Sequence, residues 1–186
     1  MTQFRKMTFL ASTILTAALA GTASAAETAS ATISGTPLGG GVTQYNIGLT
    51  DTGTTNIGTF WFGWVPGADF MEAKPTGITF PAGWSDNITG SNNSSDGNAI
   101  QWLAGPALTP GNTDQFSFDS TESLSQLLGP SSYSGHEVET TSFIYSGSPF
   151  SDGGYEFAAS AVPEPATLGL LAFSGAGLLL RRRRNA

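Results

Sequence analysis

Thr59-Phe60-Trp61-Phe62-Gly63-Trp64-Val65 is an apolar stretch in which aromatic side chains alternate along the chain. In an extended conformation Phe60, Phe62 and Trp64 share one face. The opposite face carries Trp61 and Val65. A strand with two apolar faces must be covered on both, so we expect it in the middle of a sheet. The stretch therefore predicts a β-protein organised around this strand.

The segments around this stretch alternate apolar and polar residues and stop at Gly, Pro, Asn or Asp. Tyr45, Ile47 and Leu49 share one face of a preceding strand, and Phe116 and Phe118 share one face of a later one. A period of two predicts strands. The further strands are expected at residues 77–80, 84–89, 99–103, 114–120, 137–145 and 155–159.

One helical turn interrupts the strands. Ser123 and Gln126 fit a capping box, and Gly129 ends the turn. Many short strands with Gly and Pro turns and so little helix predict an all-β fold for residues 27–160. The expected architecture is an antiparallel β-sandwich, either immunoglobulin-like or a jelly roll.

The charges are segregated along the chain, although the net charge is only -7. The basic residues lie at the two termini except for Lys74, so residues 27–160 are strongly acidic. Nucleic acids and anionic lipids need a basic patch, so both are excluded as partners of this domain. The chain has no cysteine, which excludes disulfides, thiolate metal sites and thiol nucleophiles.

Residues 1–26 have the three parts of a secretory signal peptide. A basic start with Arg5 and Lys6 precedes an apolar run, and Ala23-Ser24-Ala25 has the small-x-small form of a cleavage site. We expect the export machinery to translocate the chain and a signal peptidase to cut after Ala25 or Ala26.

Residues 161–186 form a second membrane-directed segment. Val162, Pro163, Glu164 and Pro165 precede an uncharged stretch at 166–180, which we expect to be a short transmembrane helix. The stop signal that follows consists of Arg181, Arg182, Arg183 and Arg184. By the positive-inside rule these arginines stay in the cytoplasm, which places residues 27–160 across the membrane.

The order V-P-E-P, short apolar helix and terminal Arg cluster resembles the PEP-CTERM sorting signal of Gram-negative bacteria. The resemblance implies that an exosortase, a membrane transpeptidase, cuts near Pro163-Glu164-Pro165 and releases the protein to the surface, often beside exopolysaccharide. The domain would be held transiently at the inner membrane on its periplasmic side. Short segments such as Phe60-Trp61-Phe62-Gly63-Trp64 resemble, more loosely, segments of the passenger domains that often precede such tails.

Catalytic motifs are sparse. His136 is the one histidine, and neither Gly-x-Ser-x-Gly nor Ser-x-x-Lys occurs, so no common serine nucleophile is indicated. Asp69 with Glu72, or Glu137 with Glu139, could supply the paired carboxylates of a glycosidase. A solvated acidic face is the better explanation of these carboxylates, because nothing in the sequence supplies a cleft between them, and we expect a protein that is not an enzyme.

No cofactor is expected, with weak calcium binding as the alternative. Asn92, Ser94 and Asp96 imitate the start of an EF-hand loop, but Leu103 stands where the bidentate Glu should be.

The sequence leaves two classes of function. The first is a non-catalytic surface or extracellular-matrix protein associated with exopolysaccharide. The second is a carbohydrate-binding module that stacks sugars on an exposed aromatic strip, although the same aromatics would also fill a core. The candidates for that strip are Trp61, Trp64, Trp84 and Trp102.

Overall fold

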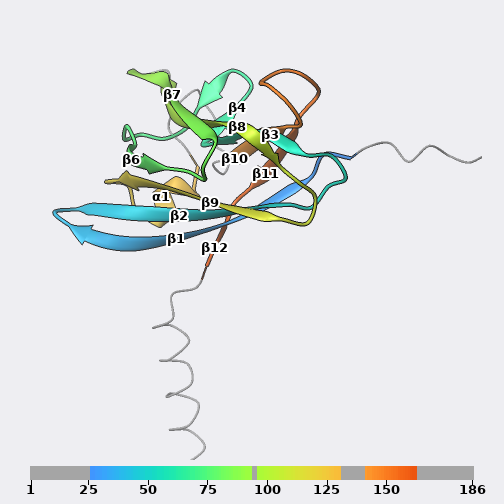
Figure 1. Cartoon of the computed structure of the whole chain (residues 1–186). Coiled ribbons are helices and arrows are strands. Elements are labelled where there is room, and N and C mark those ends of the chain that lie inside the picture. The colour runs from blue at the N-terminus through green and yellow to red at the C-terminus, as the bar shows by residue number, and fades with distance from the viewer. Residues whose placement is uncertain (1–25, 94–95, 131–140, 163–186) are drawn as a thin grey trace, which may run out of the picture.

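The computed structural model describes residues 26–93, 96–130 and 141–162, and it is a β-sandwich of two five-stranded sheets (Figure 1). One sheet has the order β12-β1-β2-β9-β6 and the other β11-β10-β3-β8-β7, while β4 and β5 form a separate ribbon. The strands are β1 (Ala29–Gly39), β2 (Val42–Asp51), β3 (Ile57–Phe62), β4 (Trp64–Val65), β5 (Ala68–Asp69), β6 (Thr76–Thr79), β7 (Trp84–Asn93), β8 (Asp96–Leu108), β9 (Thr113–Ser120), β10 (Thr141–Tyr145), β11 (Tyr155–Ala158) and β12 (Ser160–Ala161).

The strand order follows the immunoglobulin-like alternative. The run β1-β2-β9-β6 corresponds to strands A-B-E-D of that fold, and β11-β10-β3 corresponds to G-F-C. The hairpin of β7 and β8 adds two strands beside β3, which places β3 in the middle of its sheet, as predicted. Within these two sheets the ladders are antiparallel except for the parallel pair of β1 and β12.

The inner faces of the two sheets form one aromatic core. Phe60 of β3 stacks on Trp102 of β8 with ring centroids 5.1 Å apart, and Phe116 of β9 meets Trp102 at 4.9 Å. Contacts of this kind join the sheets, because Phe116 belongs to the opposite one. The other large side chains that are fully buried in this core include Tyr45, Ile47, Leu49, Ile33, Phe62 and Phe118.

The prediction that Trp64 shares a face with Phe60 and Phe62 is wrong, and the conformation of Gly63 is the reason. Gly63 adopts φ +70, and a Cβ there would lie 2.9 Å from Cγ of Met71. Strand β3 therefore ends at Phe62, and the period of two does not reach Trp64. Trp64 instead stacks on Trp61 at 4.3 Å, in a second cluster separate from the main core.

The remaining predicted elements are largely present. Helix α1 (Leu124–Leu127) has the predicted capping box, with the Ser123 side chain accepting from the Gln126 backbone N–H. Strand β1 was not predicted, because Ala29 and Ala31 give a weak apolar signal, although both face the core. Among the described residues no helix is long and apolar enough to cross a membrane. The segments 1–25 and 163–186, with the helix expected at 166–180, lie outside the described residues.

Replacing Trp102 with alanine is expected to lower the free energy of unfolding by about 3–5 kcal/mol, because it removes the buried ring that links Phe60 to Phe116. Chemical unfolding of the purified protein measures the change. The matched control is Leu38→Ala, which truncates a side chain that is 55% exposed and should cost no more than about 0.5 kcal/mol. Equal effects of the two substitutions would contradict this account of the core.

Candidate functional site

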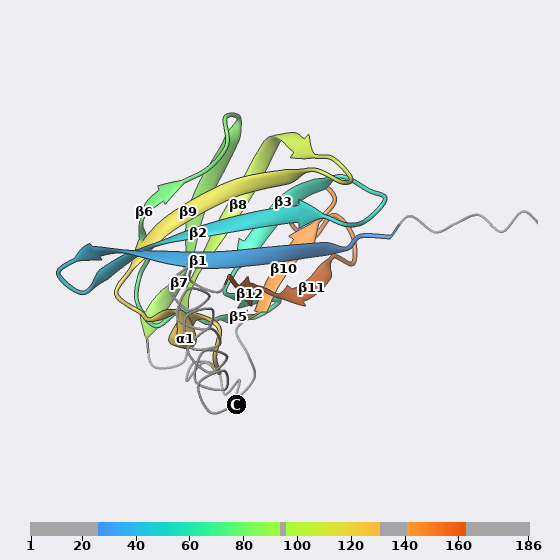
Figure 2. The ribbon, with the colours of Figure 1, turned by 90° about the horizontal axis from the view of Figure 1, so that it is seen from below.

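The last strands of the domain lead directly to the predicted sorting motif. Strand β11 pairs with β10 in one sheet, and β12 pairs with β1 in the other, so the chain changes sheets between them. Ala159 lies at this crossing and is buried in the main core. Figure 2 shows β12 beside β1 at the edge of its sheet.

Val162 is the last residue that the structure describes before the sorting motif continues. Its backbone N–H donates to the carbonyl oxygen of Ile33 at 2.9 Å, and its side chain is exposed. Of the sorting residues predicted from the sequence, Val162 is thus placed on the sheet. The others, Pro163, Glu164, Pro165 and Arg181 to Arg184, lie outside the described residues.

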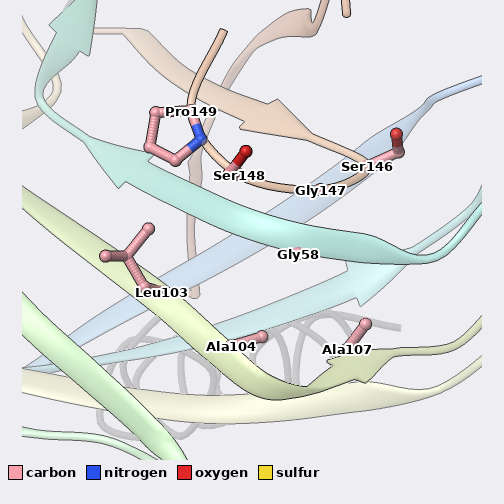
Figure 3. Close-up of a pocket in the computed structure, with 8 residues that line it drawn as sticks. All are labelled: Gly58, Leu103, Ala104, Ala107, Ser146, Gly147, Ser148 and Pro149. Atoms are coloured by element: carbon pink, nitrogen blue, oxygen red, sulfur yellow. The ribbon is translucent and has the colours of Figure 1, made fainter. Parts of the chain in front are cut away.

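An open pocket of about 390 Å³ lies between the segment 146–149 and strands β3 and β8 (Figure 3). Its floor is formed by Gly58, Leu103 and Ala104. Gly58 fits closely under the segment, because a Cβ at this position would lie 2.7 Å from the Gly147 carbonyl oxygen. No lining residue carries a titratable side chain, so this pocket can hold a small apolar group but supplies no acid or base.

The four tryptophans do not form an exposed sugar-binding strip. Trp102 is completely buried, and the other three are each only 5% exposed. Trp84 and Trp102 face the main core, while Trp61 and Trp64 pack on each other beside Phe143. The predicted strip is therefore wrong, because the aromatic faces that would stack on sugars are used for packing.

Asp69 is a buried carboxylate, and it pairs with a different residue from the one that the sequence suggested. The Thr89 hydroxyl donates to Asp69 Oδ1 at 2.5 Å, and the Asp69 backbone N–H donates to Asp96 Oδ1 at 3.3 Å. Burial raises the pKa of Asp69 to about 6; the hydrogen bond from Thr89 opposes the rise and the charge of Asp96 adds to it. Asp69 and Asp96 join β5 to β8. They are 27 residues apart in the chain, so no local sequence pattern predicted that they meet.

The predicted calcium residues are only partly within the described structure. Asp96 is described and faces Asp69, whereas Ser94 and the Asn92 side chain lie outside what the structure describes. Among the described residues no group of three or more His, Asp or Glu could hold a metal ion. His136, Glu137 and Glu139 also lie outside the described residues.

Glu122 is a second buried carboxylate, and sequence analysis did not single it out. It accepts hydrogen bonds from the backbone N–H groups of Glu72 at 3.2 Å and Ala73 at 3.0 Å. Its own carbonyl oxygen accepts from the Tyr45 hydroxyl at 2.6 Å. Burial raises the pKa of the Glu122 carboxyl, and the two backbone hydrogen bonds oppose the rise. Glu122 thus fastens the segment before β6 to the sandwich, which is a structural role.

The last strand of the β-sandwich leads directly into the segment that was predicted to be a sorting signal. A family model described as the PEP-CTERM protein-sorting motif matches residues 161–184. The chain therefore carries a PEP-CTERM sorting motif, as its sequence indicated. This motif marks an exported protein with a C-terminal membrane-anchoring signal that exosortase-like machinery sorts.

No curated protein matches the chain. A solved structure of the GH20 exo-β-N-acetylglucosaminidase from Vibrio harveyi, an inactive D437A mutant, matches with a TM-score of 0.39 and 7% sequence identity. The match covers 73% of this chain and 18% of that enzyme. A likeness of this size carries no argument about activity.

The Asp69 pair predicts a specific pH dependence. The pKa of Asp69 is 3.8 ordinarily and about 6 in the folded protein, so between these values the folded state binds more protons than the unfolded state. The stability that protonated Asp69 contributes is present below about pH 4 and is lost as the pH rises through about 6. Asp69→Asn should therefore raise the urea midpoint relative to the parent protein at pH 7 more than at pH 4.

The matched control for this experiment is Asp86→Asn, which removes an exposed carboxylate from β7. Between pH 4 and pH 7 the effect of Asp69→Asn on the urea midpoint should change by more than the effect of this control. A pH-independent effect of Asp69→Asn would show that the Asp69 carboxyl does not titrate differently on folding.

Gly58→Ala is expected to displace the segment 146–149, because the new methyl group would meet the Gly147 and Ser146 carbonyl oxygens at 2.7 and 2.8 Å. Overpacking of this kind costs about 1–3 kcal/mol, measured by chemical unfolding. Gly153→Ala serves as the control, since nothing lies within 4 Å of its added Cβ. A Gly58→Ala protein as stable as this control would contradict the close packing under the pocket.

Proposed function

We propose that the protein is an exported, non-catalytic component of the cell surface or extracellular matrix, associated with exopolysaccharide. The observation that carries this proposal is the sorting motif at residues 161–184, which begins within the last strand of the sandwich. The folded domain is thus joined to the sorting motif without an intervening linker. The resemblance of the tail to signals found beside exopolysaccharide production suggests the polymer as the neighbour of the released domain.

A non-catalytic role agrees with the surroundings of the two buried carboxylates and of the pocket described above. The Asp69 and Glu122 carboxylates are both less than a tenth exposed, and both are occupied by hydrogen bonds from their own chain. Neither therefore presents the open, facing pair that glycoside hydrolysis requires. The pocket beneath residues 146–149 likewise offers no acid, base or nucleophile of the usual kinds beyond two serine hydroxyls.

The proposed route begins with export and removal of residues 1–26 by a signal peptidase. The C-terminal segment then holds the protein in the inner membrane of a Gram-negative cell, with the sandwich in the periplasm and the arginines in the cytoplasm. An exosortase-like protease cuts near Pro163-Glu164-Pro165, and the domain moves to the surface. Its acidic character, with Lys74 as the one basic residue between the terminal segments, keeps it soluble after release.

Replacing Pro163, Glu164 and Pro165 together with alanine is expected to leave an uncut precursor in the membrane fraction. The reason is that the two prolines and the carboxylate form the predicted recognition triplet, while the anchor remains intact. Cell fractionation with intact-mass measurement, in the native host, reads out both location and processing.

Pro110→Ala is the control, because it changes an exposed proline in the turn between β8 and β9 and should be processed like the parent protein. Normal release of the triple-alanine variant would remove the basis of the proposed function.

A further inference from the structure

We infer that the processing enzyme cuts the chain on the C-terminal side of Val162, and that the folded domain itself sets this limit. The inference deepens the proposed function and rests on it. It starts from an overlap between fold and motif: the matched motif begins at Ala161, and Ala161 is the last residue of β12. The first residues of the motif therefore belong to the sheet.

The backbone around Val162 is already engaged. Thr32 and Ile33 of β1 pair with Ser160 and Ala161, and the Val162 N–H donates to the Ile33 carbonyl oxygen at 2.9 Å. Peptide-binding clefts that hold an extended chain as an added strand use these same main-chain groups. An enzyme that cut before Val162 would have to break this ladder first.

Removal of β12 from the sheet would also disturb the core. Ala159 precedes β12 and is buried at the crossing between the sheets. Phe157 and Tyr155 of β11 pack against the same core, and β11 is joined to β10 by four residue pairs. Detaching β12 far enough to enter a protease cleft would pull on Ala159, so the folded state opposes cleavage at or before Ser160.

Retention of β12 protects the product as well. Strand β1 is the edge of its sheet apart from the two residues that β12 covers. Loss of β12 would uncover the backbone of Thr32 and Ile33, and an uncovered edge strand can pair with a second chain. A cut beyond Val162 releases a domain whose β1 edge keeps this cover.

The reaction itself is ordinary peptide-bond cleavage. The C–N bond on the C-terminal side of Val162, or of a later residue in the motif, breaks. The acyl carbon passes to water, which gives a carboxylate, or to an amine acceptor, which gives a new amide. The C-terminal fragment leaves as an amine that takes up the proton.

The test is the intact mass of the released protein from its native host, with cells that lack the exosortase-like enzyme for comparison. The expected product ends at Val162 or at a later residue. A product that ends at Ala161 or earlier would overturn the inference while leaving exosortase-dependent sorting intact. Absence of any enzyme-dependent cut would overturn both the proposed function and this inference.

Two variants at Val162 test whether the ladder sets the limit. Val162→Pro removes the N–H that donates to Ile33, whereas Val162→Ala keeps it. We expect Val162→Ala to give a product with the same C-terminal residue as the parent protein. The Val162→Pro protein should yield additional products that end at Ala161 or Ser160. Identical products from the two variants would show that pairing with β1 does not limit the cut.

Discussion

The packing of Phe60 against Trp102 and Phe116 is the contact on which the rest of the structure depends. A chain without cysteine has no disulfide to hold two sheets together, so the core must do so. Phe60 and Trp102 lie on neighbouring strands of one sheet, and Phe116 reaches them from the other. Because β3 occupies the middle of its sheet, this contact positions the strands on both sides of it.

The same sheet also needs cover on its outer face, since Trp61 and Phe143 point away from the main core. Gly63 supplies this cover by ending β3 and turning Trp64 back onto Trp61. Phe150 then packs edge-on against Trp64, although it is 67% exposed and has φ 62, which is unusual for an aromatic residue. The aromatic residues that suggested a sugar platform are thus required to complete the fold.

The features that could be predicted from the sequence are those that depend on residues close together in the chain. Alternation gave most of the strands, and the Ser123 capping box was read from two residues in one turn. The PEP-CTERM motif was equally accessible, because it is a run of consecutive residues. The two buried carboxylate contacts could not be predicted, because they join residues that are far apart in the chain. Asp69 meets Asp96, and Glu122 reaches the backbone of Glu72. Neither the two-residue alternation of apolar and polar side chains nor the amino-acid composition carries information about such pairs.

The end of the fold and the start of the sorting signal are the same few residues, and this has a consequence for the order of events. Strands β11 and β12 complete one sheet each, so one sheet is complete when the chain has emerged as far as Ala158 and the other when it has emerged as far as Ala161. The motif emerges immediately afterwards. Along the chain, completion of the sandwich is therefore followed at once by the sorting motif, with no residues between the two.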